Sequence, residues 1–173
     1  MPHRLAYKGQ PTRKVKINIR PQADFREILA VLGELSLPPF IGDAENIKYA
    51  ILECLNNSLR AHREHEIKRD IITRFEVADT HLKIEIKDFG GGFDPGRLPY
   101  DLNDNPAEID HKSPAFQEYQ HKHQYQRFGM GLLLVKKTFA CFELAFFDHN
   151  DRPTKWEQGN VQGTRISVAT GGE

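Results

Sequence analysis

The chain has few cysteines, no long apolar run and no excess of either charge, and each shortage excludes a class of protein. Its only cysteines, Cys54 and Cys141, form no CxxC motif and no disulfide framework, which fits a reducing compartment. No stretch approaches the roughly 18 apolar residues of a membrane span, and residues 1–14 lack the apolar centre of a signal peptide. We therefore predict a cytoplasmic protein that does not enter a membrane.

The charges balance, because lysine plus arginine and aspartate plus glutamate each number 24. A chain without a broad basic field does not attract nucleic acid or an anionic membrane surface. The aromatic and basic side chains between residues 116 and 127 could stack on bases, but the balanced total argues against nucleic-acid binding. Any phosphate group must be held by local contacts.

Two common phosphate-binding motifs are also missing. The P-loop pattern GxxxxGK[ST] does not occur. The dinucleotide pattern GxGxxG fails at both glycine clusters, because Pro95 follows residues 90–92 and Leu134 follows residues 129–131 where the third glycine is required. Nucleotide binding would need a different kind of site.

Hydrophobic periodicity predicts an α+β protein of one domain, which suits a chain of 173 residues. Strands are expected at residues 15–20, 71–78, 82–89, 142–149 and 161–170, and helices at 23–35, 43–63 and 129–142. Consecutive strands with separate helices favour a two-layer α/β sandwich with a mixed, mainly antiparallel sheet. Residues 1–14 are predicted to be a loose leader, and residues 15–173 the domain.

Residues 94–128 show little apolar rhythm and are rich in Pro, Asn, Gln, His and Tyr. A segment of this length without regular structure, inside a compact domain, is usually a functional lid or disordered. We predict a lid over a binding site.

The helix at residues 43–63 places Glu53 and Asn57 four residues apart, so their side chains project together beside its apolar stripe. Such pairs are common on solvated helix faces. The chemistry is nevertheless suggestive, because an amide oxygen can bind Mg²⁺ and a carboxylate can accept a proton.

The sequence DFGGGF at residues 88–93 ends a predicted strand. The Asp88 carboxylate could accept a hydrogen bond from the exocyclic amine of adenine and would be repelled by the acceptor that guanine presents there. Gly90 and Gly92 could let a purine approach the main chain, although a flexible hairpin would also explain them.

A second glycine pair, Gly129 and Gly131, opens the helix of residues 129–142. Free N–H groups at a helix N-terminus bind anions, and Arg127 could add a fixed cation. A tight junction between loop and helix would account for the glycines equally well.

Together these segments resemble the GHKL ATPase superfamily, which includes gyrase, a heat-shock chaperone, histidine kinases and mismatch-repair ATPases. The resemblance rests on four motifs in the family's order over residues 15–169: the Glu53 and Asn57 pair, residues 88–93, residues 129–132, and Gly163 with Thr164. The sequences ILECLNNSLRAH and QRFGMGLLLVKK are most similar to the bacterial anti-sigma-factor serine/threonine kinases.

The resemblance implies the Bergerat ATP-binding fold and a site for ATP and Mg²⁺. It implies that Asn57 holds Mg²⁺, that Glu53 is the general base, and that Asp88, supported by Thr164, reads adenine. It further implies that Gly90 and Gly92 shape the base pocket, and that Arg127, Gly129 and Gly131 bind the phosphates.

The same resemblance implies phosphorylation of a serine or threonine on a small partner protein, an anti-sigma-factor antagonist, coupled to sequestering a sigma factor. It also implies a homodimer. Two alternatives remain open: a histidine-kinase-type module acting in trans, and a non-catalytic ATP-binding switch. Residues 94–128 look longer than the lid of the compact anti-sigma-factor kinases. His62 follows Asn57 by five residues instead of four, and a packed or capping role is favoured for it over metal binding.

Overall fold

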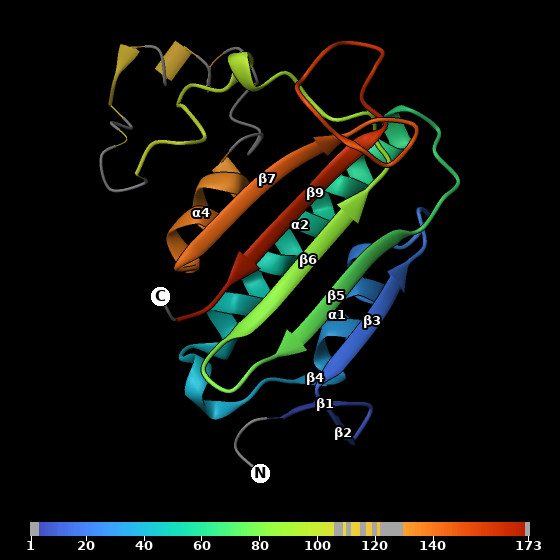
Figure 1. The fold of residues 1–173 in the computed structure, drawn as a ribbon, viewed down its shortest axis with the longest axis vertical. Coiled ribbons are helices and arrows are strands. Elements are labelled where there is room, and N and C mark those ends of the chain that lie inside the picture. Colours follow the sequence, from blue (N-terminus) through green and yellow to red (C-terminus); the bar gives the residue numbers. More distant parts are fainter. Residues whose placement is uncertain are drawn as a thin grey trace.

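The protein consists of a six-stranded antiparallel sheet with its helices on one face (Figure 1). The computed structural model describes residues 4–105, 109, 112–114, 117–118, 121 and 130–171. The strand order is β3 (Lys14–Ile19), β5 (Ile71–Val77), β6 (Leu82–Asp88), β9 (Gly163–Ala169), β7 (Cys141–Phe147) and β8 (Pro153–Thr154). The helices are α1 (Phe25–Gly33), α2 (Ala44–Glu64) and α4 (Met130–Thr138), with short 3₁₀ turns at Pro39–Ile41 and Pro95–Arg97.

This architecture confirms the predicted α+β two-layer sandwich. Every strand pair in the described part of the chain is antiparallel, so the sheet contains no parallel pair there and is not mixed. The predicted strands at residues 71–78 and 82–89 are confirmed as β5 and β6, which form an antiparallel hairpin with Val77 opposite Leu82. Within the described residues, no helix has the length and apolar character needed to cross a bilayer.

Strand β6 shows how the sequence pattern sets up the site. Its residues alternate between the two faces of the sheet, and Leu82, Ile84 and Ile86 point into the core beneath the helices. Asp88 occupies the next inward position of the same alternation. A carboxylate is therefore carried into the buried layer by the strand register itself.

Helix α2 crosses the helix-covered face of the sheet (Figure 1). Its N-terminus is capped by Asp43, whose carboxylate accepts hydrogen bonds from the backbone N–H groups of Glu45 and Asn46. Its buried face is mostly apolar, but it also carries Ser58 and His62, one turn apart. Both polar side chains need hydrogen-bond partners in the buried layer.

The N-terminal leader differs from the loose segment that was expected. Strand β1 (Leu5–Tyr7) pairs with β2 (Gln10–Thr12) and with β4 (Leu35–Ser36) in a second, three-stranded sheet. Leu5 is 1% exposed and joins the main core. A single buried leucine and a Lys-Gly turn within a polar segment gave too weak a pattern for this hairpin to be recognised.

The helix predicted at residues 129–142 is too long, because α4 ends at Thr138. Cys141 and Phe142 instead begin β7, where they pair with Ala169 and Val168 of β9. The apolar pattern continues from α4 into β7, so periodicity does not show where the helix ends. The boundary is set by the pairing of β7 with β9.

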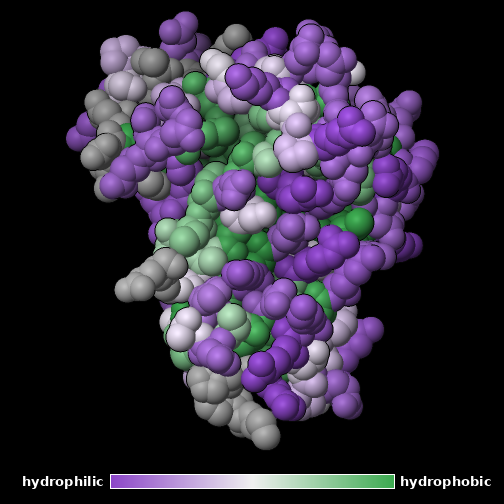
Figure 2. Space-filling model, viewed as in Figure 1, coloured by the Kyte–Doolittle hydropathy of each residue, from purple (hydrophilic) through white to green (hydrophobic). Residues whose placement is uncertain are grey.

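The face of the sheet opposite the helices is largely hydrophilic, with apolar surface showing between the polar side chains (Figure 2). Lys83, Glu85 and Lys87 of β6 alternate with the buried residues of that strand and point to this side. The two faces of the sheet therefore differ in chemistry, and the candidate site lies on the helix side.

Candidate functional site

A cavity of about 180 Å³ lies between α2, the end of β6, β9 and α4. Its polar wall contains Ser58, Asp88 and Thr164, which are each at most 8% exposed. Other lining residues are Cys54, Asn57, Arg60, Ala61, Glu64, His65, Gly92, Phe93, Leu98, Leu132 and Ile166. Apolar walls with a few convergent polar groups are typical of small-molecule sites.

Asp88 is held on both carboxylate oxygens. Ser58 Oγ donates to Asp88 Oδ2 at 2.7 Å, and the backbone N–H of Gly90 donates to Asp88 Oδ1 at 3.1 Å. Burial raises the pKa of Asp88, and the hydrogen bonds from Ser58 and Gly90 oppose that rise. The carboxylate is therefore oriented by the protein while it borders the cavity.

Thr164 lies directly beside Asp88, because the two residues are opposite each other in the antiparallel pair of β6 and β9. The preceding residue, Gly163, makes this approach possible. A Cβ atom at Gly163 would lie 1.9 Å from the carbonyl oxygen of Asp88, so no other residue fits there without a shift of the backbone. Close packing against the Asp88 main chain therefore explains why the residue before Thr164 is a glycine.

Glu53 and Asn57 meet the glycine at the start of α4. A Cβ atom at Gly131 would lie 3.0 Å from Glu53 Oε2 and 3.2 Å from Asn57 Nδ2. Both side chains are half-buried, and Asn57 also lines the cavity that contains Asp88. The structure therefore brings together the Glu53 and Asn57 pair, the segment of Asp88 and the glycine Gly131. The first and last of these are more than 70 positions apart in the sequence.

The glycines at the end of β6 serve different contacts. A Cβ atom at Gly90 would lie 2.5 Å from Ala61 Cβ on α2, so this glycine lets the chain pass closely against the helix. Gly92 has φ of +71°, a left-handed conformation that favours glycine, and a Cβ there would meet Val161 at 2.8 Å. Gly92 lines the cavity, whereas Gly90 does not line it and packs against α2.

Cys54 forms part of the cavity wall as a neutral thiol. Burial raises its pKa to about 12, and the nearby carboxylates of Glu53 and Asp88 add to that rise. A thiol in this state is not a nucleophile at neutral pH. It packs as a small apolar group.

The first part of the expected lid is anchored on α4. Leu98 and Tyr100 pack against Leu133. Lys136 donates hydrogen bonds to the backbone carbonyls of Leu102 and Asp104. Two of the predicted phosphate-binding residues, Arg127 and Gly129, and most of residues 106–128, lie outside the described residues.

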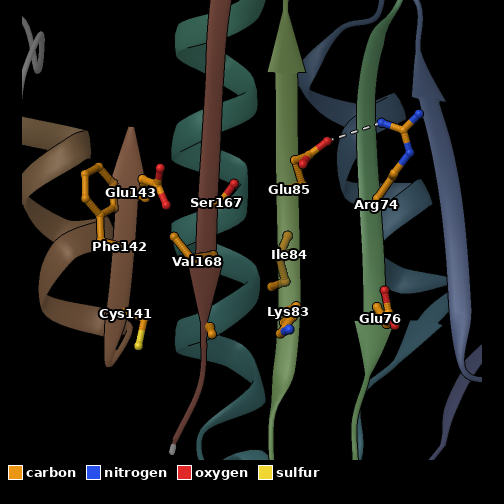
Figure 3. Close-up of a pocket in the computed structure, with 11 residues that line it drawn as sticks. Arg74, Glu76, Lys83, Ile84, Glu85, Cys141, Phe142, Glu143, Ser167 and Val168 are labelled. Atoms are coloured by element: carbon orange, nitrogen blue, oxygen red, sulfur yellow. Dashed lines mark hydrogen bonds and ion pairs between the residues drawn. The ribbon is translucent and has the colours of Figure 1, made fainter. Parts of the chain in front are cut away.

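A larger hollow of about 410 Å³ lies on the opposite face of the sheet (Figure 3). It is bordered by charged side chains, among them Arg74 and Glu85, which form an ion pair at 3.3 Å. Glu143 and Ser167 point into the same hollow. None of the predicted site residues that the structure describes lines it. Size alone therefore does not identify the candidate site.

Two features of the site were not predicted from sequence. Ser58 lies on the buried, mostly apolar face of α2, where a hydroxyl signals a polar partner opposite it. Arg60 of the same helix also lines the cavity, and it was not predicted from the sequence as a site residue. Its position, three residues after Asn57, places it near the same edge of α2 and could have been noticed.

No group of three or more His, Cys, Asp or Glu side chains in the described part of the chain is arranged to hold a metal ion. A Mg²⁺ ion that accompanies a nucleotide does not need one, because it uses one or two protein oxygens together with phosphates and water. Asn57, half-buried beside Gly131, has an amide oxygen of the required kind.

The family model described as histidine kinase-like ATPase domain matches residues 20–145 of the chain. The match includes Glu53, Asn57, Asp88 and Gly131, and it ends within β7. No curated protein matches the chain significantly.

Proposed function

Because the chain belongs to the histidine kinase-like ATPase domain family, whose members bind ATP, we propose that it is an ATP- and Mg²⁺-dependent protein kinase. In this proposal it phosphorylates a serine or threonine of a small regulatory partner protein. The observation that carries the proposal is the position of Asn57, which lines the cavity of Asp88 and also lies beside Glu53 and Gly131. One nucleotide could therefore reach from the buried carboxylate to the proposed base.

The adenine end of the site is assigned to Asp88. Its carboxylate is oriented by Ser58 and Gly90, and an ionised carboxylate can only accept hydrogen bonds. It would accept from the exocyclic amine of adenine and repel the carbonyl oxygen of guanine. Thr164 supports this edge, and Gly92 leaves room beside the plane of the base.

The phosphate end is assigned to Asn57 and to the start of α4. Asn57 would offer its amide oxygen to Mg²⁺, and Gly131 keeps the approach free of a Cβ atom. From the resemblance alone, Gly129 and Arg127 are assigned to the phosphates as well. When bound, ATP would supply the phosphoryl group and Mg²⁺ would offset the charge of the phosphates.

Glu53 is proposed as the general base that takes the proton of the attacking hydroxyl. A surface groove of about 450 Å³ supports a protein substrate, since Glu53 lines it together with Phe25, Tyr49, Leu52, Asn56, Asn57 and Arg60. Asn57 and Arg60 line both this groove and the cavity. Phe25 and Tyr49 are 52% and 44% exposed, so the groove offers apolar surface to a peptide segment beside the base.

The partner proposed from the resemblance is an anti-sigma-factor antagonist or a sigma factor, and a homodimer is proposed on the same ground. Genes next to the one for this chain would test that choice. A small antagonist or sigma-factor gene among them would support it.

Calorimetry with ATP and Mg²⁺ is the first test of the proposed function. We expect measurable binding that favours ATP over GTP and depends on Mg²⁺. Replacing Asn57 by Ala is expected to remove the dependence on Mg²⁺. An unchanged magnesium titration would refute the role of Asn57, and no binding of ATP at all would refute the whole site.

Transfer of radiolabelled γ-phosphate to proteins that copurify with the chain tests the reaction. We expect label on serine or threonine, and its loss in Glu53→Ala while ATP binding persists. Label on histidine would favour the histidine-kinase alternative. Binding without transfer to any partner or to water would favour the non-catalytic switch.

A further inference from the structure

His62 is completely buried where α2 crosses the end of β6. Its ring lies edge-on to Phe89, with 6.4 Å between the ring centroids. Phe89 directly follows Asp88, so His62 contacts the segment that carries the proposed adenine-binding carboxylate. His62 follows Asn57 by five residues and Ser58 by one helical turn, so its imidazole lies on the buried face of α2.

Both ring nitrogens of His62 make hydrogen bonds to the main chain. Together these two contacts determine which nitrogen carries the hydrogen. The backbone N–H of Phe89 donates to Nε2 at 2.8 Å, so Nε2 carries no hydrogen. Nδ1 lies 3.1 Å from the carbonyl oxygen of Arg69 and must therefore be the donor. Only the neutral tautomer with its hydrogen on Nδ1 satisfies both contacts.

The hydrogen bond from Phe89 completes a set of contacts around one short turn. Ser58 binds the Asp88 side chain, Gly90 N–H binds the same carboxylate, and His62 binds the peptide group between them. Arg69, whose carbonyl accepts from His62, also places its guanidinium carbon 3.6 Å from the centroid of the Phe89 ring. The turn is thus fixed from the helix side and from the loop before β5.

We propose that neutral His62 is a positioning residue that holds the turn at residues 88–90 in its nucleotide-binding conformation and makes ATP affinity sensitive to acid. This inference rests on the proposed function. Protonation of Nε2 would set two N–H donors against each other, and the contact to Phe89 would be lost. The turn would then be free to move the Asp88 carboxylate away from the adenine edge.

The charged groups that face His62 are Asp88, which favours its protonation, and Arg69, which opposes it. Burial has the largest effect and lowers the pKa of His62 below its ordinary value. The side chain is therefore neutral at physiological pH, and the contact to Phe89 fails only below the ordinary pKa of histidine. Asp88 itself titrates with a raised pKa, so an experiment must separate the two groups.

Two substitutions separate the two hydrogen bonds. His62→Gln can place an amide oxygen near the position of Nε2 and keep the bond from Phe89, but it cannot be protonated. His62→Asn reaches only to the position of Nδ1 and can keep the bond to Arg69 while it loses Phe89. We would measure ATP affinity by calorimetry between about pH 7.5 and 4.5, a range that extends below the ordinary pKa of histidine, and unfolding by urea at each pH as a control.

We expect His62→Gln to bind ATP within about twofold of the unaltered chain at neutral pH and to lose less affinity on acidification. We expect His62→Asn to bind about tenfold more weakly at neutral pH, the effect of one hydrogen bond. A purely structural role would lower the stability of both variants without separating their ATP affinities or changing the pH profile.

Equal affinities in the two variants, or an unchanged pH profile in His62→Gln, would overturn the inference while leaving ATP binding intact. Failure of the unaltered chain to bind ATP with Mg²⁺ would instead overturn the proposed function, and this inference with it. If His62→Asn does not fold, the pH profile of His62→Gln decides alone.

Discussion

Ser58 Oγ donates a hydrogen bond of 2.7 Å to Asp88 Oδ2 and so joins the middle of α2 to the last residue of β6. The residues are 30 positions apart, and each is almost completely buried. The contact connects the two layers of the sandwich at the wall of the cavity. It also orients the carboxylate, which would reduce the ordering cost of a ligand that binds to it.

Replacing Ser58 by Ala should weaken both the fold and the site. The buried carboxylate of Asp88 would lose a donor, at a cost of about 1–3 kcal/mol in the free energy of unfolding. Its pKa would rise further, because the hydrogen bond from Ser58 lowers it. We expect ATP to bind about tenfold more weakly, measured by calorimetry beside urea unfolding.

Ser167→Ala is the matched control, since Ser167 points to the open face of the sheet (Figure 3). We expect it to change stability by less than about 0.5 kcal/mol and to leave ATP affinity unchanged. Equal effects of the two substitutions would contradict the role assigned to Ser58.

Replacing Asp88 by Asn should raise stability at neutral pH while it impairs selectivity for ATP. Burial raises the pKa of Asp88 above that of the unfolded chain, so the folded protein binds more protons between the two values. The free energy of unfolding therefore falls as pH rises through the folded pKa, and the ionised form lowers stability above it. Asn has nearly the same shape and carries no charge.

Urea unfolding of the parent and Asp88→Asn proteins between pH 3 and pH 8, a range of about five units around the ordinary pKa of aspartate, measures this effect. We expect the variant to be the more stable at neutral pH, and the difference to shrink toward the acid end. Because the Asp88 carboxylate favours protonation of His62, the substitution also changes the titration of His62, and the comparison is therefore repeated in the His62→Gln background. Unaltered preference for ATP over GTP in the variant would show that Asp88 does not read adenine.

Much of the fold could be predicted because its strands alternate regularly. The alternation in β5 and β6 fixed their inward faces, and the position of Asp88 follows from counting along β6. The start of α2 was predictable from the capping residue Asp43. The leader hairpin and the start of β7 were not, since both depend on pairing with distant strands.

The candidate site was predictable only in part. Glu53 and Asn57 could be placed together from helical spacing, but their contact with Gly131 depends on how α4 packs on α2. The missing Cβ of Gly90 makes room for Ala61 of α2, a contact that the sequence did not predict. Such close approaches between elements leave no periodic signal in a single sequence.

Replacing Gly131 by Ala should impair phosphotransfer. The new Cβ would press on Glu53 Oε2 and Asn57 Nδ2 at 3.0 and 3.2 Å, so both side chains would have to move. Small displacements of a base and a metal ligand cost large factors in rate, and we expect a loss of about tenfold or more. The loss in ATP affinity without Mg²⁺ should be smaller.

Gly33→Ala provides the control, because Gly33 also lies in a helix and a Cβ there meets no atom within 4 Å. We expect unchanged phosphotransfer and a gain in stability of up to about 1 kcal/mol. If Gly131→Ala were as active as Gly33→Ala, the convergence of Glu53 and Asn57 at Gly131 would have no catalytic importance.

Replacing Gly90 by Ala should overpack the contact between the end of β6 and α2. The added Cβ would lie 2.5 Å from Ala61 Cβ and 3.2 Å from the Ala61 carbonyl carbon. Overpacking of this kind costs about 1–3 kcal/mol in the free energy of unfolding. ATP affinity should fall as well, because the N–H of Gly90 is one of the donors that orient Asp88.

The double variant Gly90→Ala with Ala61→Gly tests whether this single contact is responsible. Ala61→Gly alone should cost about 1 kcal/mol, the usual penalty of glycine within a helix. In the double variant the side-chain clash is relieved. Its loss in the free energy of unfolding should therefore be smaller than the sum of the two single losses by about 1 kcal/mol or more. Strict additivity in urea unfolding would mean that the chain relaxes at Gly90 without moving against α2. ATP affinity that recovers together with stability would show that the close packing of β6 on α2 positions the carboxylate of Asp88.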